Sequence, residues 1–139
     1  MQILQPPGWA KPRGYANGVA ATGRIVCVGG QVGWNGRGEF ESDDFIVQAR
    51  QALANVVAVL AEAGAEPRHV TRMNWYLLDK REYIASYREL GRVYREIIGD
   101  HYPAMTAVQV VALIEDRARV EIEATAVIPD AGVADAVKR

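Results

Sequence analysis

Few residues in this chain have the type and spacing to do chemistry, and several of them lie near glycines. The pair Gly29-Gly30 follows an apolar run. Its backbone N–H groups can cradle an anion, although a glycine pair more often only turns the chain. Two cations, Lys11 and Arg13, stand close to Tyr15. Arg13 is therefore a candidate anion contact, with a plain surface role as the simpler interpretation.

Metal and thiol chemistry find little support in the sequence. His69 and His101 are the only histidines, and neither belongs to a paired or HExxH-like arrangement. Cys27 is the only cysteine, which excludes an intrachain disulfide and a cysteine-built metal cage. It lies in an apolar run over 25–28, where a buried cysteine acts as a small hydrophobe. Zinc catalysis and a cysteine-based metal site are therefore not expected.

Size and charge narrow the classes of function. The 139 residues fit one domain, 50% of them are hydrophobic, and the net charge is −1. A chain without a basic face or stripe lacks the electrostatic footprint of a nucleic-acid-binding protein. The N-terminus does not resemble a signal peptide, and no run approaches the roughly 18 uninterrupted apolar residues of a membrane helix. We expect a cytoplasmic protein with no nucleic-acid or membrane partner.

Residues 1–14 are rich in proline and glycine and are expected to be irregular. The predicted strands and helices that position the candidate residues follow this segment. Two short apolar stretches over 15–21 and 24–29 predict a β-hairpin, and a glycine-rich loop follows. A first helix is predicted from an N-cap at Ser42 or Asp43 to a stop at Gly64, because apolar residues recur between them at helical spacing.

The second half of the chain predicts a strand, a helix and then two further strands. A strand over 70–78 precedes a helix over 79–98, which opens on the Asp-x-x-Glu spacing of a capping box. Residues 106–113 are nearly all apolar, as is typical of a strand buried on both faces. Residues 119–128 alternate between apolar and polar, and the charged segment before them predicts a hairpin. The tail over 130–139 is expected to fray.

This order, ββαβαββ, predicts a single α+β domain over 1–139, with one mixed sheet and both helices on one of its faces. The other face of such a sheet must be covered or wet. The apolar content of residues 106–113 favours a cover, which a second subunit would supply.

An ordered set of short motifs resembles the RidA/YjgF family. No single motif is specific, but together they span the chain from about Lys11 to Val127 in the order and spacing of the family. The motifs are Gly14-Tyr15-x-x-Gly18-Val19, Gly29-Gly30-Gln31-Val32, the helical run over 48–56, Ala61-x-Ala63-Gly64, Tyr94-x-x-Ile97-Ile98, Pro103-Ala104 and the strand over 120–127.

The resemblance implies a chorismate-mutase-like fold, a homotrimer and small-molecule clefts between its subunits. It also implies hydrolysis of an enamine or imine to a ketone and ammonia without cofactor or metal. Carried over to this chain, the glutamate that positions water is Glu121, and the tyrosine of the cleft is Tyr15. Gly30 and Gln31 match the family as well. Without the resemblance, Glu121 would count as an ordinary solvent-exposed carboxylate.

The chain differs from the family at positions that would bind the substrate. Met105 replaces the arginine after Pro-Ala, Gly29 replaces the serine of a Ser-Gly pair, and Ala107 replaces a nearby cysteine. Gly91 corresponds to the helix asparagine. Methionine cannot make the bidentate contact that arginine makes with a carboxylate, so a small carboxylated imine is not the expected substrate. A soft methionine suits an apolar ligand instead.

Three functions stay open on the sequence. The first is deamination of an apolar or aromatic enamine or imine, with Glu121 as general base and Tyr15 and Met105 at the pocket. The second is a non-catalytic homotrimer that binds a hydrophobic metabolite, as sensor or carrier. The third, a ribonuclease, is opposed by the net charge of −1. Trp34 and Trp75 are candidate pocket walls, with core or interface roles as the simpler interpretation.

Overall fold

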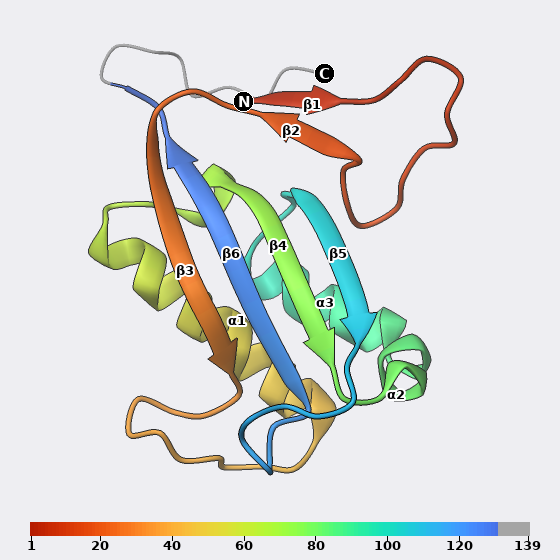
Figure 1. Cartoon of the computed structure of the whole chain (residues 1–139), viewed down its shortest axis with the longest axis vertical. Helices are drawn as coiled ribbons and strands as arrows, with labels where there is room; N and C mark the ends of the chain where they lie inside the picture. The colour runs from red at the N-terminus through yellow and green to blue at the C-terminus, as the bar shows by residue number, and fades with distance from the viewer. Residues whose placement is uncertain (131–139) are drawn as a thin grey trace.

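Helices cover one face of a mixed four-stranded sheet in the computed structural model, which describes residues 1–130 (Figure 1). The strand order is β3-β6-β4-β5. β3 and β4 run antiparallel to β6, and β5 runs parallel to β4. The predicted α+β architecture is therefore confirmed. The four strands are β3 (Arg24–Val32), β4 (Val70–Leu77), β5 (Ala104–Gln109) and β6 (Val120–Ile128).

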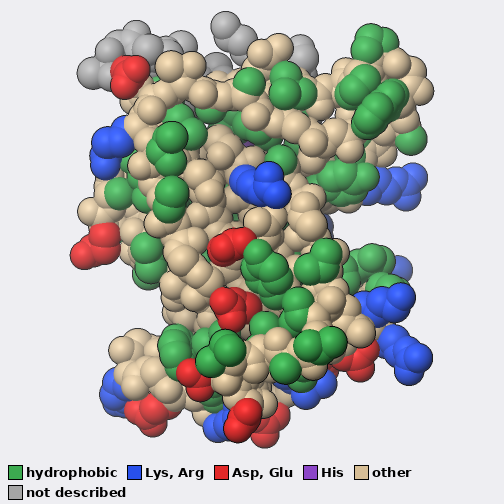
Figure 2. Space-filling view, in the orientation of Figure 1, with side chains coloured by type: hydrophobic (Ala, Val, Ile, Leu, Met, Phe, Trp, Pro, Cys, Tyr) green, Lys and Arg blue, Asp and Glu red, His purple; other side chains and the backbone are tan. Residues whose placement is uncertain are grey.

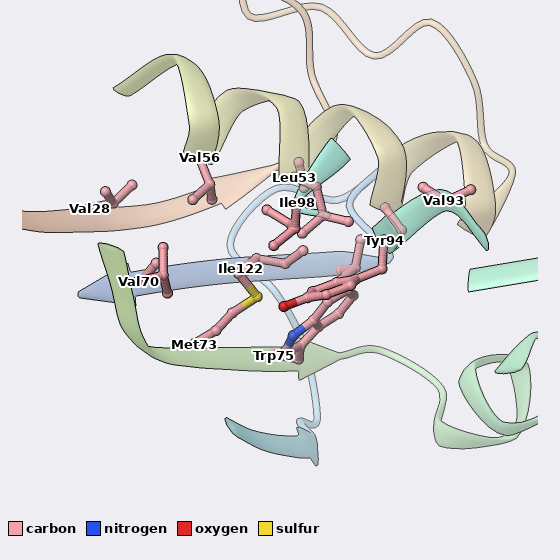
Figure 3. Packing of buried hydrophobic residues seen from close by; sticks show 14 of the residues in the cluster. Val28, Leu53, Val56, Val70, Met73, Trp75, Val93, Tyr94, Ile98 and Ile122 are labelled. Atoms are coloured by element: carbon pink, nitrogen blue, oxygen red, sulfur yellow. The ribbon is translucent and has the colours of Figure 1, made fainter. Parts of the chain in front are cut away.

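The first predicted helix is present as α1 (Phe45–Glu62). Its N-cap is Asp44 rather than the predicted Ser42 or Asp43, because the Asp44 carboxylate accepts a hydrogen bond of 3.0 Å from the backbone N–H of Val47. Leu53 and Val56 of α1 meet residues of the sheet in the core (Figure 3). By length and composition α1 could also span a membrane, but its apolar side packs on the sheet, as in the core helix of a globular domain.

The second helical region is interrupted, whereas the sequence predicted one helix over 79–98. It forms α2 (Lys80–Ala85) and α3 (Tyr87–Ile97), which meet at Ser86. Asp79 caps α2, but Glu82 does not complete the predicted capping box. Glu82 instead accepts hydrogen bonds of 2.9 and 3.0 Å from Arg119 Nε, which draws its side chain toward the sheet. A short 3-10 turn, η1 (Pro67–His69), precedes β4.

The N-terminal hairpin differs from the predicted one. β1 (Gln2–Leu4) pairs antiparallel with β2 (Gly18–Ala20), so the first residues of the segment over 1–14 are not irregular. β2 does not pair with β3: β2 pairs with β1 in a two-stranded sheet, and β3 pairs with β6. The Gly29-Gly30 pair, predicted to lie in a loop, belongs to β3, at an irregularity between Val28 and Gln31.

The position of β5 corrects two predictions. β5 does not form a hairpin with β6, because β4 lies between them. A parallel neighbour requires a crossover, which α2 and α3 supply between β4 and β5. β5 also ends at Gln109 and lies at the edge of the sheet, where its last four residues are exposed in the single chain rather than buried on both faces. Their burial by another subunit stays a prediction.

The sheet face without helices is chemically mixed (Figures 1 and 2). The predicted alternation of β6 is confirmed: Ile122 and Ala124 face the helices, whereas Glu121 and Glu123 face away. Cys27 of β3 also faces away and is exposed, so the expectation of a buried cysteine is wrong. Acidic and basic side chains lie among hydrophobic ones on this open face (Figure 2). The tail over 131–139, predicted to fray, lies outside the described residues.

Candidate functional site

A hollow of about 910 Å³ lies at the β5 edge of the sheet, and we call it the edge pocket. Its volume falls in the range of roughly 300–1,000 Å³ typical of small-molecule sites. Three parts of the chain form its walls: the loop before β2, the strands β4 and β5, and the helical region with the turn that follows it. The lining residues are Arg13, Gly14, Tyr15, Trp75, Tyr83, Tyr87, Leu90, Gly91, Tyr94, Arg95, Tyr102, Met105 and Ala107.

The edge pocket brings together Tyr15, Met105 and Ala107, three of the residues selected from the sequence. Ala16 fixes the position of Tyr15, because its N–H donates a hydrogen bond of 2.9 Å to the carbonyl of Pro103 immediately before β5. Met105 and Ala107 are alternate residues of β5, so their side chains leave the strand on the same face. The edge pocket therefore brings the segment before β2 against β5.

Aromatic side chains form much of the wall. Tyr83 lies near Trp75 and Tyr87, with ring centroids 6.2 and 5.2 Å away. Tyr94 stacks on Tyr102 at 5.5 Å and donates a hydrogen bond of 2.6 Å from its hydroxyl to the carbonyl of His101. Burial raises the pKa of the Tyr83 and Tyr94 hydroxyls. These phenols are therefore neutral near pH 7.

Sequence reasoning missed most of this wall. Tyr83, Tyr87 and Tyr94 recur at helical spacing within the predicted helix over 79–98, as residues of an ordinary core face do. The available signal was their type, because a tyrosine carries a polar hydroxyl that needs a hydrogen-bond partner when it is buried. Trp75 is 3% exposed, so it is both a core residue and part of the pocket wall. Trp34 packs on Phe40 and does not line the edge pocket.

Two arginines also line the edge pocket. Neither the Arg13 nor the Arg95 side chain forms a hydrogen bond or an ion pair with any residue between 1 and 130. The Arg95 guanidinium extends over Gly91, where a Cβ atom would lie 3.4 Å from Arg95 Nη1. Asp and Glu are absent from the described lining residues, so the pocket carries a net positive charge.

The other predicted site residues form a second group. Glu121 lies on the open face of β6, and its carboxylate is adjacent to Gly30, where any Cβ atom would overlap it. Gln31 donates a hydrogen bond of 3.2 Å from Nε2 to the carbonyl of Gly29. Gly29 also lines a smaller hollow of about 280 Å³ on the open face, together with Glu123.

Glu121 and Glu123 differ in how they are bound. Within the described chain, the Glu121 carboxylate accepts no hydrogen bond and forms no ion pair. Glu123 accepts hydrogen bonds from the Tyr76 hydroxyl and, at 3.0 Å, from Asn74 Nδ2. These hydrogen bonds, that of Tyr76 first, lower the pKa of Glu123. Of the two carboxylates, Glu121 is the one without a hydrogen-bond or ion-pair partner among residues 1–130.

The two groups of candidate residues lie on different strands of the sheet, and Glu121 lies on the interior strand β6. Gly29, Gly30 and Gln31 belong to β3, whereas Met105 belongs to β5, with β6 and β4 between them. Neighbouring strands lie about 4.8 Å apart, so three intervals place the edges roughly 14 Å from each other. One chain therefore cannot assemble all the predicted residues around one small molecule.

The described residues contain no cluster of three His, Cys, Asp or Glu side chains suited to a metal ion. Both histidines take part in local structure. His69 Nδ1 accepts a hydrogen bond of 2.9 Å from the backbone N–H of Glu66, and His101 Nε2 lies 2.7 Å from the carbonyl of Val70. Neither histidine lines the edge pocket.

Comparison with known proteins identifies the family. The family model for endoribonuclease L-PSP matches residues 10–128. A crystal structure from Yersinia pestis, of a protein of unknown function in the conserved Rid family, superposes with a TM-score of 0.78. That structure is 32% identical, and the alignment covers 91% of this chain and 97% of the other. The chain belongs to the RidA/YjgF family. Its fold is the RidA/YjgF fold that the sequence predicted.

Two further RidA/YjgF relatives carry functional information in their names. The human 2-iminobutanoate/2-iminopropanoate deaminase is 30% identical over 105 residues, which are 75% of this chain and 73% of the human protein. The structure of Escherichia coli TdcF with bound serine is 31% identical, with a TM-score of 0.65, and the alignment covers 88% of this chain and 92% of TdcF.

Proposed function

We propose that this chain is a hydrolytic deaminase of an apolar or aromatic enamine or imine. The observation that carries the proposal is the Glu121 carboxylate, which lies beside Gly30 and has no hydrogen-bond partner in the described chain. Membership of the RidA/YjgF family and similarity to a human imine deaminase support it.

In the proposed reaction, Glu121 accepts a hydrogen bond from a water molecule and takes its proton as the water oxygen attacks the imine carbon. The C=N bond becomes a single bond as its electron pair moves to nitrogen, and Glu121 passes to that nitrogen the proton it took from water, which gives a neutral amino alcohol. Glu121 then removes the hydroxyl proton of the amino alcohol as the C=O bond forms and the C–N bond breaks. It delivers this second proton to the departing nitrogen, so that imine and water give ketone and ammonia.

The proposed reaction needs more than one copy of the chain, because Glu121 and Gly30 lie far from Tyr15 and Met105. A ring of three copies would set the β3 side of one chain against the β5 edge of the next, and each contact would be the same. Exposed apolar side chains mark surfaces suited to such contacts: Ile25, Val108, Val111 and Ile114. Sedimentation should give about three times the 15.2 kDa mass of one chain; a monomer would contradict the proposed assembly.

The assay that tests the function generates imines in place with an amino-acid oxidase and measures the added rate of ammonia release. We expect the wild-type chain to accelerate hydrolysis of aromatic imines and Glu121→Gln to lose about 10²-fold or more. Glu123→Gln is the matched control, two residues along the same strand face, and should keep the activity. Equal rates for wild type and Glu121→Gln would contradict the mechanism.

The role of Met105 is tested in the same assay. A charge-assisted hydrogen bond contributes roughly 1.5–3 kcal/mol, so Met105→Arg should raise the rate on small carboxylated imines by about 10-fold or more. Met105→Leu keeps the apolar character of the position and should leave the preference of the wild type unchanged. If Met105→Arg brought no gain on small substrates, residue 105 would not lie at the carboxylate.

A second candidate function is a homotrimer that binds a small molecule without turnover. The positions that depart from the family support it, since Met105, Gly29 and Gly91 remove three polar groups from the cleft. The TdcF structure with bound serine shows that a related chain binds a small molecule. Specific binding together with no turnover on any imine would favour this function over the deaminase.

A further inference from the structure

We infer that the edge pocket selects a carboxylate attached to an aromatic group, and that Arg13 and Arg95 bind this carboxylate in place of an arginine at position 105. The ligand class is an aromatic 2-imino acid or its enamine tautomer. The inference rests on the proposed function, because it names the substrate class of the same cleft.

The edge pocket carries positive charge that no acidic side chain of the described lining neutralises. Arg13 and Arg95 both line the pocket, and neither guanidinium has an acidic partner among residues 1–130. The phenols of Tyr83 and Tyr94 stay protonated near pH 7, because burial raises their pKa. A Glu121 contributed by a neighbouring copy would leave the site with an excess of positive charge, so an anion is the favoured ligand.

Aromatic and apolar side chains form much of the lining of the edge pocket. Trp75, Tyr83, Tyr87 and Leu90 offer broad apolar surfaces to the pocket, and Met105 adds a soft side chain. Aromatic cages often bind cations, but two unpaired guanidiniums repel a cation here. The apolar surface therefore suits the body of the ligand, and the guanidiniums suit its charged end.

The Arg95 side chain lines the edge pocket next to Gly91. Gly91 lies one turn before it on α3 and has no side chain, so the Arg95 guanidinium extends over the helix surface at the pocket. Two adjacent N–H groups of a guanidinium match the two oxygens of a carboxylate. Arg13 lines the same pocket from the loop that also carries Tyr15. In the proposed complex, the ligand carboxylate contacts both guanidiniums.

Calorimetry on the assembled full-length protein tests the inference without turnover. The probes are 3-phenylpropanoate, the neutral 3-phenylpropan-1-ol, the cationic 3-phenylpropylammonium and the small anion propanoate. We expect the aromatic carboxylate to bind about tenfold more tightly than the alcohol, and propanoate and the ammonium compound to bind weakest. Arg95→Gln and Arg13→Gln should each weaken binding of 3-phenylpropanoate by about tenfold and leave the alcohol unchanged.

Arg92→Gln is the matched control, because Arg92 is exposed on the same helix and does not line the pocket. It should not alter binding of any probe. Equal affinity for the carboxylate and the alcohol, or no effect of either pocket arginine, would overturn the inference. Selective carboxylate binding without imine turnover would sustain the ligand class while refuting the deaminase. Turnover that is unaffected by Arg13→Gln and Arg95→Gln would sustain the deaminase and refute the ligand class.

Discussion

The carboxylate of Glu121 lies so close to Gly30 that a methyl group on residue 30 would overlap its Oε2 atom. Gly30 thereby determines where this carboxylate can rest. We predict that Gly30→Ala displaces the Glu121 side chain and lowers imine hydrolysis by about 10²-fold, as expected when a general base is misplaced. The contact is with the end of a flexible side chain, so the melting temperature should fall by no more than about 4 °C.

Gly36→Ala is the control for Gly30→Ala, since no atom lies within 4 Å of a Cβ atom built at Gly36. This variant should match the wild type in both hydrolysis rate and melting temperature. The proposed positioning of Glu121 would be refuted if Gly30→Ala folded normally and kept the wild-type rate. Assays and thermal melts on the same preparations make the comparison direct.

Gln48 ties α1 to the start of β6. Its amide Nε2 donates to the carbonyls of Ser42 and Arg117 at 3.0 and 2.9 Å, and its Oε1 accepts from the N–H of Arg119 at 2.8 Å. Gln48 is 1% exposed, so Gln48→Leu would leave these backbone groups without partners. We predict a loss of about 3 kcal/mol in the free energy of unfolding, measured in urea.

Gln51→Leu is the matched comparison, one turn further along α1. The Gln51 amide donates one hydrogen bond of 2.8 Å, to the side chain of Asn55, and no backbone group depends on it. Its loss should be below about 1 kcal/mol. Equal losses for the two variants would show that the buried backbone contacts of Gln48 contribute little.

The hydrogen bond from Tyr76 to Glu123 gives stability a defined pH dependence. This bond is the main cause of the lowered pKa of Glu123, whose usual value is 4.5. A carboxyl with a lowered folded-state pKa stabilises the fold above its usual pKa, and that contribution is lost as the pH falls through the lowered value. Tyr76→Phe should therefore be less stable than wild type at pH 7, and the difference should shrink below about pH 4.

NMR titration of the Glu123 side-chain carbon measures the same effect directly. In Tyr76→Phe the Glu123 pKa should rise toward 4.5, although the remaining hydrogen bond from Asn74 keeps it from reaching that value. Tyr87→Phe is the comparison, because Tyr87 is 57% exposed and does not contact Glu123. An unchanged Glu123 titration in Tyr76→Phe would contradict the assigned cause.

Mixed assemblies test whether each site draws on two chains. Glu121→Gln and Tyr15→Ala each impair one of the two residue groups, so either variant alone should be nearly inactive. Chains of the two variants, unfolded together and refolded as a mixture, should regain roughly a quarter of the wild-type activity, because random assembly leaves that share of the clefts intact. Refolded wild type sets the reference rate. A mixture no more active than its parts would show that both groups act within one chain.

The parts of the fold with a local signal could be predicted from the sequence. The alternation of β6 and the helical spacing of α1 each record burial by residues of the same chain, so both predictions are confirmed. β5 could not be predicted in this way. Its apolar run looks like a central strand, because an apolar run alone does not tell a central strand from a strand at the edge of a sheet. Its parallel pairing with β4 also depends on a crossover distant in sequence.

The candidate site, too, could be predicted only in part. Tyr15, Met105 and Ala107 came from the family resemblance, and they do line one pocket. The contribution of Arg95 was not visible, because an arginine late in an amphipathic helix is indistinguishable from any solvated charge. The interruption at Ser86 was missed as well, since the tyrosines on either side of it continue the helical spacing.

The loop that carries Arg13 and Tyr15 joins β1 to β2 and contributes little to the buried core. A backbone hydrogen bond from Ala16 to the carbonyl of Pro103 attaches this loop to the residue before β5. Loops of this kind tolerate substitution and changes of length far better than the elements around them. Exchanging residues 6–15 for those of a relative would graft one wall of the pocket onto an unchanged sheet. Variant libraries confined to this stretch could therefore change ligand preference while the framework that holds Trp75 and Met105 stays intact.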